Sequence, residues 1–296
     1  MPRYAPTNNL LFLKCFASPE NADVLAGFIQ DVLGLPVAEA TVENPYDVRR
    51  VRERLAHTVV DVLARLGDGS LVTIEMQVQP QRHFAGRALY YAASRYVAGY
   101  GRAGGLPALP SAGCAAGCGG EGGGGTPGAP YASLRPVFGI NVCDFDLFPG
   151  CPDPLRCFGL FDTTYQTEFP GPPLHVSFLQ LRKEALPGQK GLARWLSFFR
   201  GEEPAEGAPA YIGKARRAVL YANLDEKERE MIDYAEMSRA DAQGQLEYAW
   251  DEGMAQGMAR GISQTAARML AKGIEPDTIR DITGLDAEAI RLLGEN

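Results

Sequence analysis

The 296-residue chain lacks several features that would assign it to a common class. It has no apolar run of about 18 residues, the length that a membrane-spanning helix needs, so we expect no transmembrane segment. The first residues, MPRYAPTNNLLFLKCF, contain too short an apolar stretch and no small-residue cleavage pattern, and we expect no secretory signal. Only three histidines are present, and no motif for Ser/His/Asp catalysis accompanies them.

The six cysteines form no recognisable framework. Cys114 and Cys118 lie in a glycine-rich stretch, while Cys143, Cys151 and Cys157 surround a predicted strand and a proline-rich loop. None of them has the tight paired spacing of a zinc site, which disfavours structural zinc. Because no signal sequence is recognised, we expect reduced thiols and a cytoplasmic protein.

One segment carries an unusual pattern. Residues 58–79, TVVDVLARLGDGSLVTIEMQVQ, alternate in character on both sides of a Gly-Asp-Gly turn and predict a β-hairpin. Centring that hairpin on Asp68 places Asp61 opposite Glu75. The polar residues then share one face and the apolar residues the other: Asp61, Thr73, Glu75 and Gln77 against Val60, Val62, Ala64, Val72, Ile74, Met76 and Val78.

Two facing carboxylates on neighbouring strands destabilise a hairpin unless a cation lies between them. A divalent ion held by Asp61 and Glu75 would turn the repulsion into binding energy, and Mg²⁺, with Mn²⁺ as the alternative, suits these oxygen ligands. Such an ion activates water and neutralises charge on a phosphodiester transition state. Gln77 lies on the same face, where its amide can orient a water or a phosphate oxygen. The alternative interpretation is two solvent-facing acids on an exposed sheet face.

Net charge of −7 argues against a protein coated in basic surface. It does not exclude a nucleic-acid enzyme, because a local groove meets the phosphates. The densest basic cluster leads into the strand of Asp61, and its members are candidate contacts to a DNA backbone: Arg49, Arg50, Arg52 and Arg54. Arg87, in the helix predicted after the hairpin, is a further candidate, with a solvated helix face as the alternative.

Helical and strand patterns surround the hairpin. Residues 8–35 carry two helical patterns, the second stopping at Gly34. Residues 81–100 predict an amphipathic helix with an aromatic face. Strands are expected at 134–145, 157–165 and 174–182, followed by a helix at 192–202 that packs Trp195, Phe198 and Phe199 inward.

Composition divides the chain into two predicted parts. Residues 103–130 are a low-complexity, glycine-rich insert that cannot bury enough apolar surface to offset its ordering entropy, so we expect a mobile loop there. We predict a domain at 1–205 that contains this insert and a helical C-terminal region at 206–296.

The C-terminal region contains a period-four pattern, DEGMAQGMARGI, that predicts close packing of one helix against another. Charged residues interrupt the pattern, which favours contact in water over contact in a membrane. Residues 264–293 predict two or three short helices with breaks at Gly273 and Gly284. Their acidic character favours packing or homo-oligomerisation over reading of a DNA groove.

The chain resembles the PD-(D/E)xK nuclease superfamily, and more closely its Rpn-type branch of recombination-promoting nucleases and transposases. The resemblance covers about residues 6–202 and rests on NNLLFLKCFASPENADVLAGFIQDVLGL, VVDV…GDGSLVTIEMQ, FAGRALYYAASRYV, LRPVFGINVCDFDLF and LARWLSFF. It implies a restriction-endonuclease-like α/β fold, a mixed central sheet flanked by helices with a helical C-terminal extension. It also implies a Mg²⁺-dependent DNA endonuclease acting in recombination or transposition, with Asp61 and Glu75 as metal ligands and Gln77 at the position of the superfamily lysine.

The chain departs from that family at its N-terminal helix. Where the family usually has an acidic residue and a lysine, this chain has Asn9 and Leu13, and the adjacent Lys14 is turned by about 100° along a helix. These departures and the absent lysine motivate a second hypothesis, a catalytically weak or inactive nuclease-fold protein that acts as a DNA-binding or protein-interaction module.

Overall fold

The computed structural model describes residues 4–46, 61–100 and 130–294. The glycine-rich insert predicted at 103–130, apart from its last residue, and the arginine cluster of residues 49–54 therefore lie outside the described residues. The chain forms two compact units, Met1–Ile232 and Asp233–Asn296.

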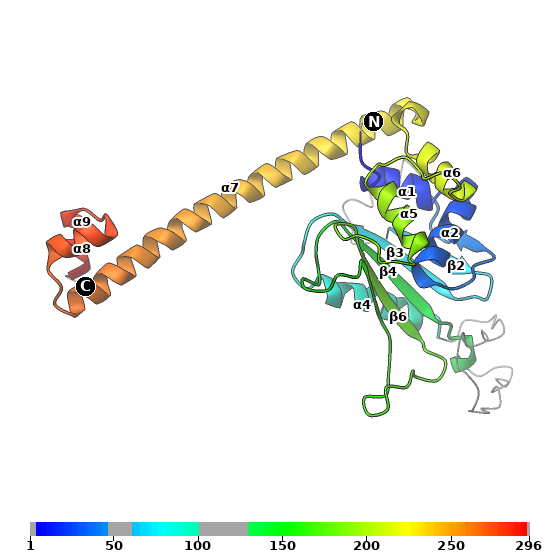
Figure 1. The fold of residues 1–296 in the computed structure, drawn as a ribbon, viewed down its shortest axis with the longest axis horizontal. Coiled ribbons are helices and arrows are strands. Elements are labelled where there is room, and N and C mark those ends of the chain that lie inside the picture. Colours follow the sequence, from blue (N-terminus) through cyan, green and yellow to red (C-terminus); the bar gives the residue numbers. More distant parts are fainter. Residues whose placement is uncertain (1–3, 47–60, 101–129, 295–296) are drawn as a thin grey trace. The chain divides into compact units, whose positions relative to one another are not determined.

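A mixed sheet of six strands, in the order β1-β2-β3-β4-β6-β5, is the centre of the first unit (Figure 1). Strands β1, β2 and β3 pair antiparallel, β3, β4 and β6 pair parallel, and β5 returns antiparallel along β6. The bounds are β1 Ala40–Val42, β2 Val62–Leu66, β3 Leu71–Gln77, β4 Val137–Cys143, β5 Leu155–Phe158 and β6 Leu174–Gln180. The predicted mixed α/β architecture is confirmed.

Four helices cover one face of the sheet: α1 (Asn9–Phe16), α2 (Ala22–Leu33), α5 (Lys190–Phe199) and α6 (Ala210–Ala218). The Asn8 side chain caps α1 by accepting from the amides of Leu10 and Leu11, and α2 ends at Gly34, as predicted, in the left-handed conformation at φ 68°. Short 3-10 turns precede α2 at Pro19–Asn21 and lie elsewhere at Pro130–Ser133 and Tyr221–Asn223.

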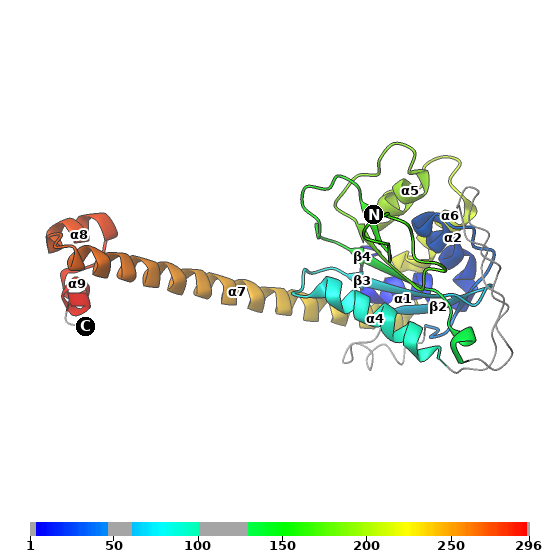
Figure 2. The ribbon, with the colours of Figure 1, turned by 90° about the horizontal axis from the view of Figure 1, so that it is seen from below.

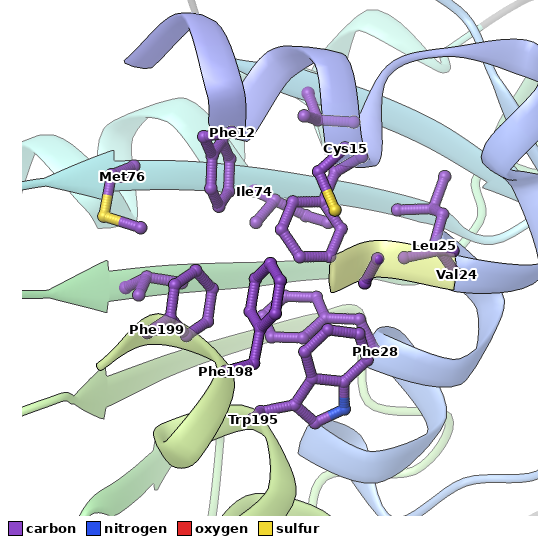
Figure 3. Close-up of a cluster of buried hydrophobic side chains, with 14 of the residues drawn as sticks. Phe12, Cys15, Val24, Leu25, Phe28, Ile74, Met76, Trp195, Phe198 and Phe199 are labelled. Carbon is purple, nitrogen blue, oxygen red and sulfur yellow. The ribbon is translucent and has the colours of Figure 1, made fainter. Parts of the chain in front are cut away.

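Aromatic side chains fill the space between these helices and the sheet (Figure 3). Phe16 lies centrally, with its ring centroid 4.8 Å from those of both Phe12 and Phe28 and 5.7 Å from that of Trp195. Trp195 and the two phenylalanines that end α5 point inward as predicted, and all three are buried. Ile74 and Met76 of β3 face the same core, which confirms the predicted apolar side of the hairpin.

The opposite face of the sheet is covered by α4 (Phe84–Ala98), which lies in front of the strands in the view from below (Figure 2). A second, smaller core joins Phe84, Ala88 and Ala92 of this helix to Val137 and Phe178 of the sheet. Every residue of β4 is buried. The polar face of the hairpin is therefore not an open sheet surface, and the interpretation of Asp61 and Glu75 as acids on an exposed face does not hold.

The second unit consists of the later part of α7 (Glu226–Ala271) with α8 (Pro276–Thr283) and α9 (Ala287–Gly294). The helix breaks predicted at Gly273 and Gly284 are confirmed, with φ of 75° and 71°. Its small core contains Ala266, Ile279 and Ile290. Helix α6, which the sequence assigned to the C-terminal region, packs on α2 instead because Ile212 and Ala215 contribute to the core of the first unit.

No helix in the described parts of the chain combines the length and apolar character needed to cross a bilayer.

Candidate active site

The predicted hairpin forms with the predicted register. Strands β2 and β3 pair Val62 with Ile74 and Leu63 with Thr73, and continuing this register by one residue brings Asp61 opposite Glu75. The turn is closed by Asp68, whose carboxylate accepts the amide of Ser70 at 2.8 Å, and by Gly69 at φ 87°. The local sequence thus predicts the register and the turn that the structure has.

Asp61 lies immediately before β2, and its carboxylate is bound to the neighbouring strand. Its Oδ2 accepts a hydrogen bond of 2.7 Å from the backbone amide of Met76. In an antiparallel ladder, that amide would normally donate to a carbonyl of the partner strand. The side chain of Asp61 takes this place, which holds its carboxylate beside the peptide bond that joins Glu75 to Met76.

Glu75 and Gln77 share the face beneath α4 and meet the same guanidinium. Arg87 Nη2 donates to Glu75 Oε1 and to Gln77 Oε1, both at 2.8 Å. The Gln77 amide is fixed at its other end, where Nε2 donates to the carbonyl of Gln79 at 2.8 Å. Arg87 also binds Gln81 and lies over the Phe84 ring at 5.2 Å. The predicted grouping of Glu75 with Gln77 is observed, and Arg87 joins it.

Burial governs the electrostatics of the site. The Glu75 side chain is 13% exposed, and desolvation raises its pKa although the charge and hydrogen bond of Arg87 act in the opposite direction. The negative charge of Glu75 in turn helps to raise the pKa of Tyr91, after desolvation of that phenol itself. Asp61 contributes to the same shift. The charges of both carboxylates therefore reach the same side chain of α4.

Sequence reasoning missed two neighbours of Glu75. Asn141 of β4 pairs with Glu75 in the parallel register and is 3% exposed, and its Nδ2 donates to the carbonyl of Ser177 at 3.1 Å. Tyr91 of α4 is the other neighbour, since the charge of Glu75 adds to the effect of burial in raising the pKa of its phenol. Asn141 had a detectable signal, because it is the single strongly polar residue in the buried strand VFGINVC.

The remaining candidates fall into two groups. Arg49, Arg50, Arg52 and Arg54 lie outside the described residues, so their predicted DNA contacts stay predictions. Asn9 is exposed at the start of α1. Lys14 does not reach the site, because its ammonium pairs at 2.5 Å with Glu228, which also accepts from the Tyr46 hydroxyl at 3.2 Å. Helix α1 therefore supplies no lysine to the site in place of the one that the family usually has.

The residues present suit a hard divalent cation. Two carboxylates and an amide oxygen are the donors that Mg²⁺ accepts, with water completing its shell. Within the described ranges there is no group of three or more His, Cys, Asp or Glu side chains that could hold a metal ion, so Asp61 and Glu75 would bind one as a pair of carboxylates. The half-buried Glu75 already has a cationic partner in Arg87.

One comparison with known proteins gives a match, and it is to a family. Residues 6–103 match the family model described as PD-(D/E)XK nuclease family transposase. That match covers about a third of the chain and includes α1, α2, the hairpin and α4. Searches among curated proteins and among solved structures gave no significant match. Asp61, Glu75, Gln77 and Arg87 all lie inside the matched segment.

Proposed function

We propose that the protein is a Mg²⁺-dependent endodeoxyribonuclease that hydrolyses phosphodiester bonds in DNA during recombination or transposition. The observation that supports this most is the hairpin site. The half-buried Glu75 lies in β3, and the anchored Asp61 immediately precedes the neighbouring strand β2. The family match to nuclease-type transposases covers the segment that contains them.

In this proposal Asp61 and Glu75 hold Mg²⁺, or Mn²⁺ in its place. When bound, the ion supplies a Lewis acid that activates water and neutralises charge on the scissile phosphate. Asp61 keeps one oxygen on the Met76 amide, so its carboxylate is oriented before any ligand arrives. Gln77 has no acid–base function near neutral pH, and its amide orients a water or phosphate oxygen.

We propose that DNA binds over this site with Arg87 as one contact to the phosphates. The side chain of Arg87 is 27% exposed, so part of its guanidinium reaches solvent beside Glu75. A planar guanidinium suits the oxygens of a phosphate group. The cluster of Arg49, Arg50, Arg52 and Arg54 would extend the contact along the backbone.

Plasmid nicking by the purified full-length chain tests the proposal. Nicking is expected with Mg²⁺, is expected to be lost in Asp61→Ala, and is expected to persist in Glu206→Ala, which removes an exposed acid from the loop before α6. Equal nicking by Asp61→Ala and the unmodified protein would identify a contaminating nuclease and count against the proposal.

A second candidate function is a nuclease-fold DNA-binding or protein-interaction module with weak or no cleavage. Two observations favour it. Arg87 contacts both Glu75 and Gln77, and Lys14 is paired with Glu228 and supplies no charge to the site. Absence of nicking by every variant, together with salt-dependent retention of DNA, would select this alternative.

We further propose that the protein acts in the cytoplasm, without a membrane, and forms a homo-oligomer through its C-terminal helices. Helix α7 exposes large apolar side chains along its length, among them Leu246, Tyr248, Trp250 and Met254. Such side chains commonly mark contact surfaces. Sedimentation of the full-length chain beside Trp250→Ser is expected to show loss of the oligomer in the variant.

A further inference from the structure

A positive charge already occupies the neighbourhood of the proposed metal ligands. The guanidinium of Arg87 donates from one nitrogen, Nη2, to Glu75 Oε1 and to Gln77 Oε1 at equal distances of 2.8 Å. These are the oxygens that face outward from β3 toward α4. In this arrangement Arg87 supplies the charge that would otherwise be missing beside a buried carboxylate.

Arg87 and a divalent ion compete for Glu75. Both require the same carboxylate, and two cations sharing it would repel each other at short distance in a partly buried site. Because the Glu75 side chain is 13% exposed, solvent screens that repulsion only in part. Metal binding is therefore expected to be weakened for as long as the guanidinium remains on Glu75.

The position of Arg87 allows its guanidinium to exchange Glu75 for another anion. It lies in the first turn of α4, and its side chain is 27% exposed. Apart from Glu75 and Gln77 it contacts Gln81 and the Phe84 ring, and its buried Nε has no hydrogen-bond partner within the described part of the chain. A phosphate offers a guanidinium two oxygens in the geometry that it binds most strongly. A DNA phosphate arriving at this edge would thus provide a better partner than Glu75 shared with a metal ion.

We infer that Arg87 is an exchangeable counter-ion that couples DNA binding to metal binding. Without DNA it neutralises Glu75, and with DNA it moves to a phosphate and leaves Glu75 to the metal. By linkage, DNA then tightens metal binding and the metal tightens DNA binding by the same factor. The inference rests on the proposed function, since it concerns the same two ligands.

The test measures Mn²⁺ affinity of the full-length chain by the EPR signal of the free ion, without DNA and with a saturating short DNA duplex that a gel shows to be uncut at the time of reading. In the unmodified protein, DNA is expected to tighten Mn²⁺ binding about tenfold. In Arg87→Gln, binding without DNA is expected to be about tenfold tighter than in the unmodified protein, with little further effect of DNA.

The matched control is Arg95→Gln, which removes the same charge two turns further along α4 and is expected to keep the full DNA effect. Arg87→Lys retains a cation without the planar fork and is expected to fall between the two. Thermal unfolding of each variant shows whether it is folded. If Arg87→Gln folds poorly, the Mn²⁺ affinities of Arg87→Lys with and without DNA decide between the outcomes.

Two outcomes overturn the inference, and they differ. Equal Mn²⁺ affinity without DNA in Arg87→Gln and the unmodified protein, with the DNA effect intact in both, rejects Arg87 as the coupling residue but leaves the nuclease proposal standing. No Mn²⁺ binding by the unmodified protein, with or without DNA, rejects the metal site itself and the coupling with it.

Discussion

The carboxylate of Asp61 accepts a hydrogen bond of 2.7 Å from the backbone amide of Met76, the residue that follows Glu75. This contact gives Asp61 two roles at once. It ends the β2–β3 ladder by replacing a backbone acceptor, and it fixes the direction of one proposed metal ligand against the strand that carries the other. The hydrogen-bonding role and the charge of Asp61 can therefore be separated by mutation.

Asp61→Asn is expected to keep most of the stability of the protein, because the amide oxygen of asparagine still accepts from Met76. Asp61→Ala leaves that amide without its partner and is expected to lower the free energy of unfolding by about 1–3 kcal/mol. Urea unfolding of both variants measures the difference. Both are expected to lose Mn²⁺ binding alike, since both lose the charge. A stability loss of equal size in the two variants would contradict a specific role of the Met76 bond.

The stability contribution of Glu75 is expected to depend on pH. Burial raises the pKa of this carboxyl, with Arg87 opposing the rise, so the folded protein holds the Glu75 proton more tightly than the unfolded chain does. The ionised side chain therefore costs stability above the folded pKa, and that cost disappears as the pH falls through it. At neutral pH and without metal, the free energy of unfolding of Glu75→Gln is expected to equal or exceed that of the unmodified protein.

The comparison is made by urea unfolding across a series of pH values, with Glu206→Gln as an exposed control. The advantage of the Glu75→Gln variant over the unmodified protein is expected to shrink on acidification. An advantage that grows as the pH falls would have the wrong sign and would contradict the buried, ionised carboxylate.

The cysteines are expected to differ in reactivity. Burial raises the pKa of the Cys143 thiol to about 12, with the charge of Glu75 adding to the rise, and burial also raises the pKa of Cys15. The pKa of Cys151 is lowered, first by a hydrogen bond from Arg156. Because the thiolate is the reactive form, iodoacetamide is expected to label Cys151 well before Cys15 or Cys143 in the native protein. Mass spectrometry of the peptides measures the order, and early labelling of Cys143 would contradict its burial.

Gly27 in α2 is expected to resist the usual stabilising replacement. Alanine in a helix is ordinarily favoured over glycine by about 1 kcal/mol. Here a Cβ on Gly27 would lie 2.8 Å from two ring carbons of Tyr211, whose hydroxyl is held by Asp31 at 2.8 Å. Gly27→Ala is therefore expected to destabilise the protein by about 1–3 kcal/mol.

The matched control for Gly27→Ala is Gly213→Ala in another helix, α6. There the nearest atom to the added Cβ is 3.6 Å away, in the flexible Arg217 side chain. This variant is expected to be neutral or stabilised by up to about 1 kcal/mol. Thermal unfolding measures both. A stabilised Gly27→Ala protein would show that Tyr211 does not pack on α2 as described.

Much of the hairpin and its surroundings could be predicted because the signals are local. Alternation around a Gly-Asp-Gly turn defines both the strands and their register, and the observed pairs Val62 with Ile74 and Leu63 with Thr73 follow that register. Helix ends at Gly34, Gly273 and Gly284 followed from the positive φ that glycine tolerates.

The surroundings of Glu75 could not be predicted in the same way. Asn141 reaches Glu75 through parallel pairing of β3 with β4, and that pairing depends on a long crossover connection and not on a turn. The packing of α6 on the first unit was likewise missed, because which surface a helix covers is decided by the complementary faces of distant elements.

By itself the sequence determined the hairpin, its register, its apolar side and the helices beside it, because strand and helix periodicities act over a few neighbouring residues. Only the tertiary structure decided that α4 closes over that polar side and brings Arg87 onto Glu75 and Gln77. The physical reason is burial: a carboxylate withdrawn from water needs a counter-charge, and the packing of α4 on the sheet supplies one that no local pattern encodes.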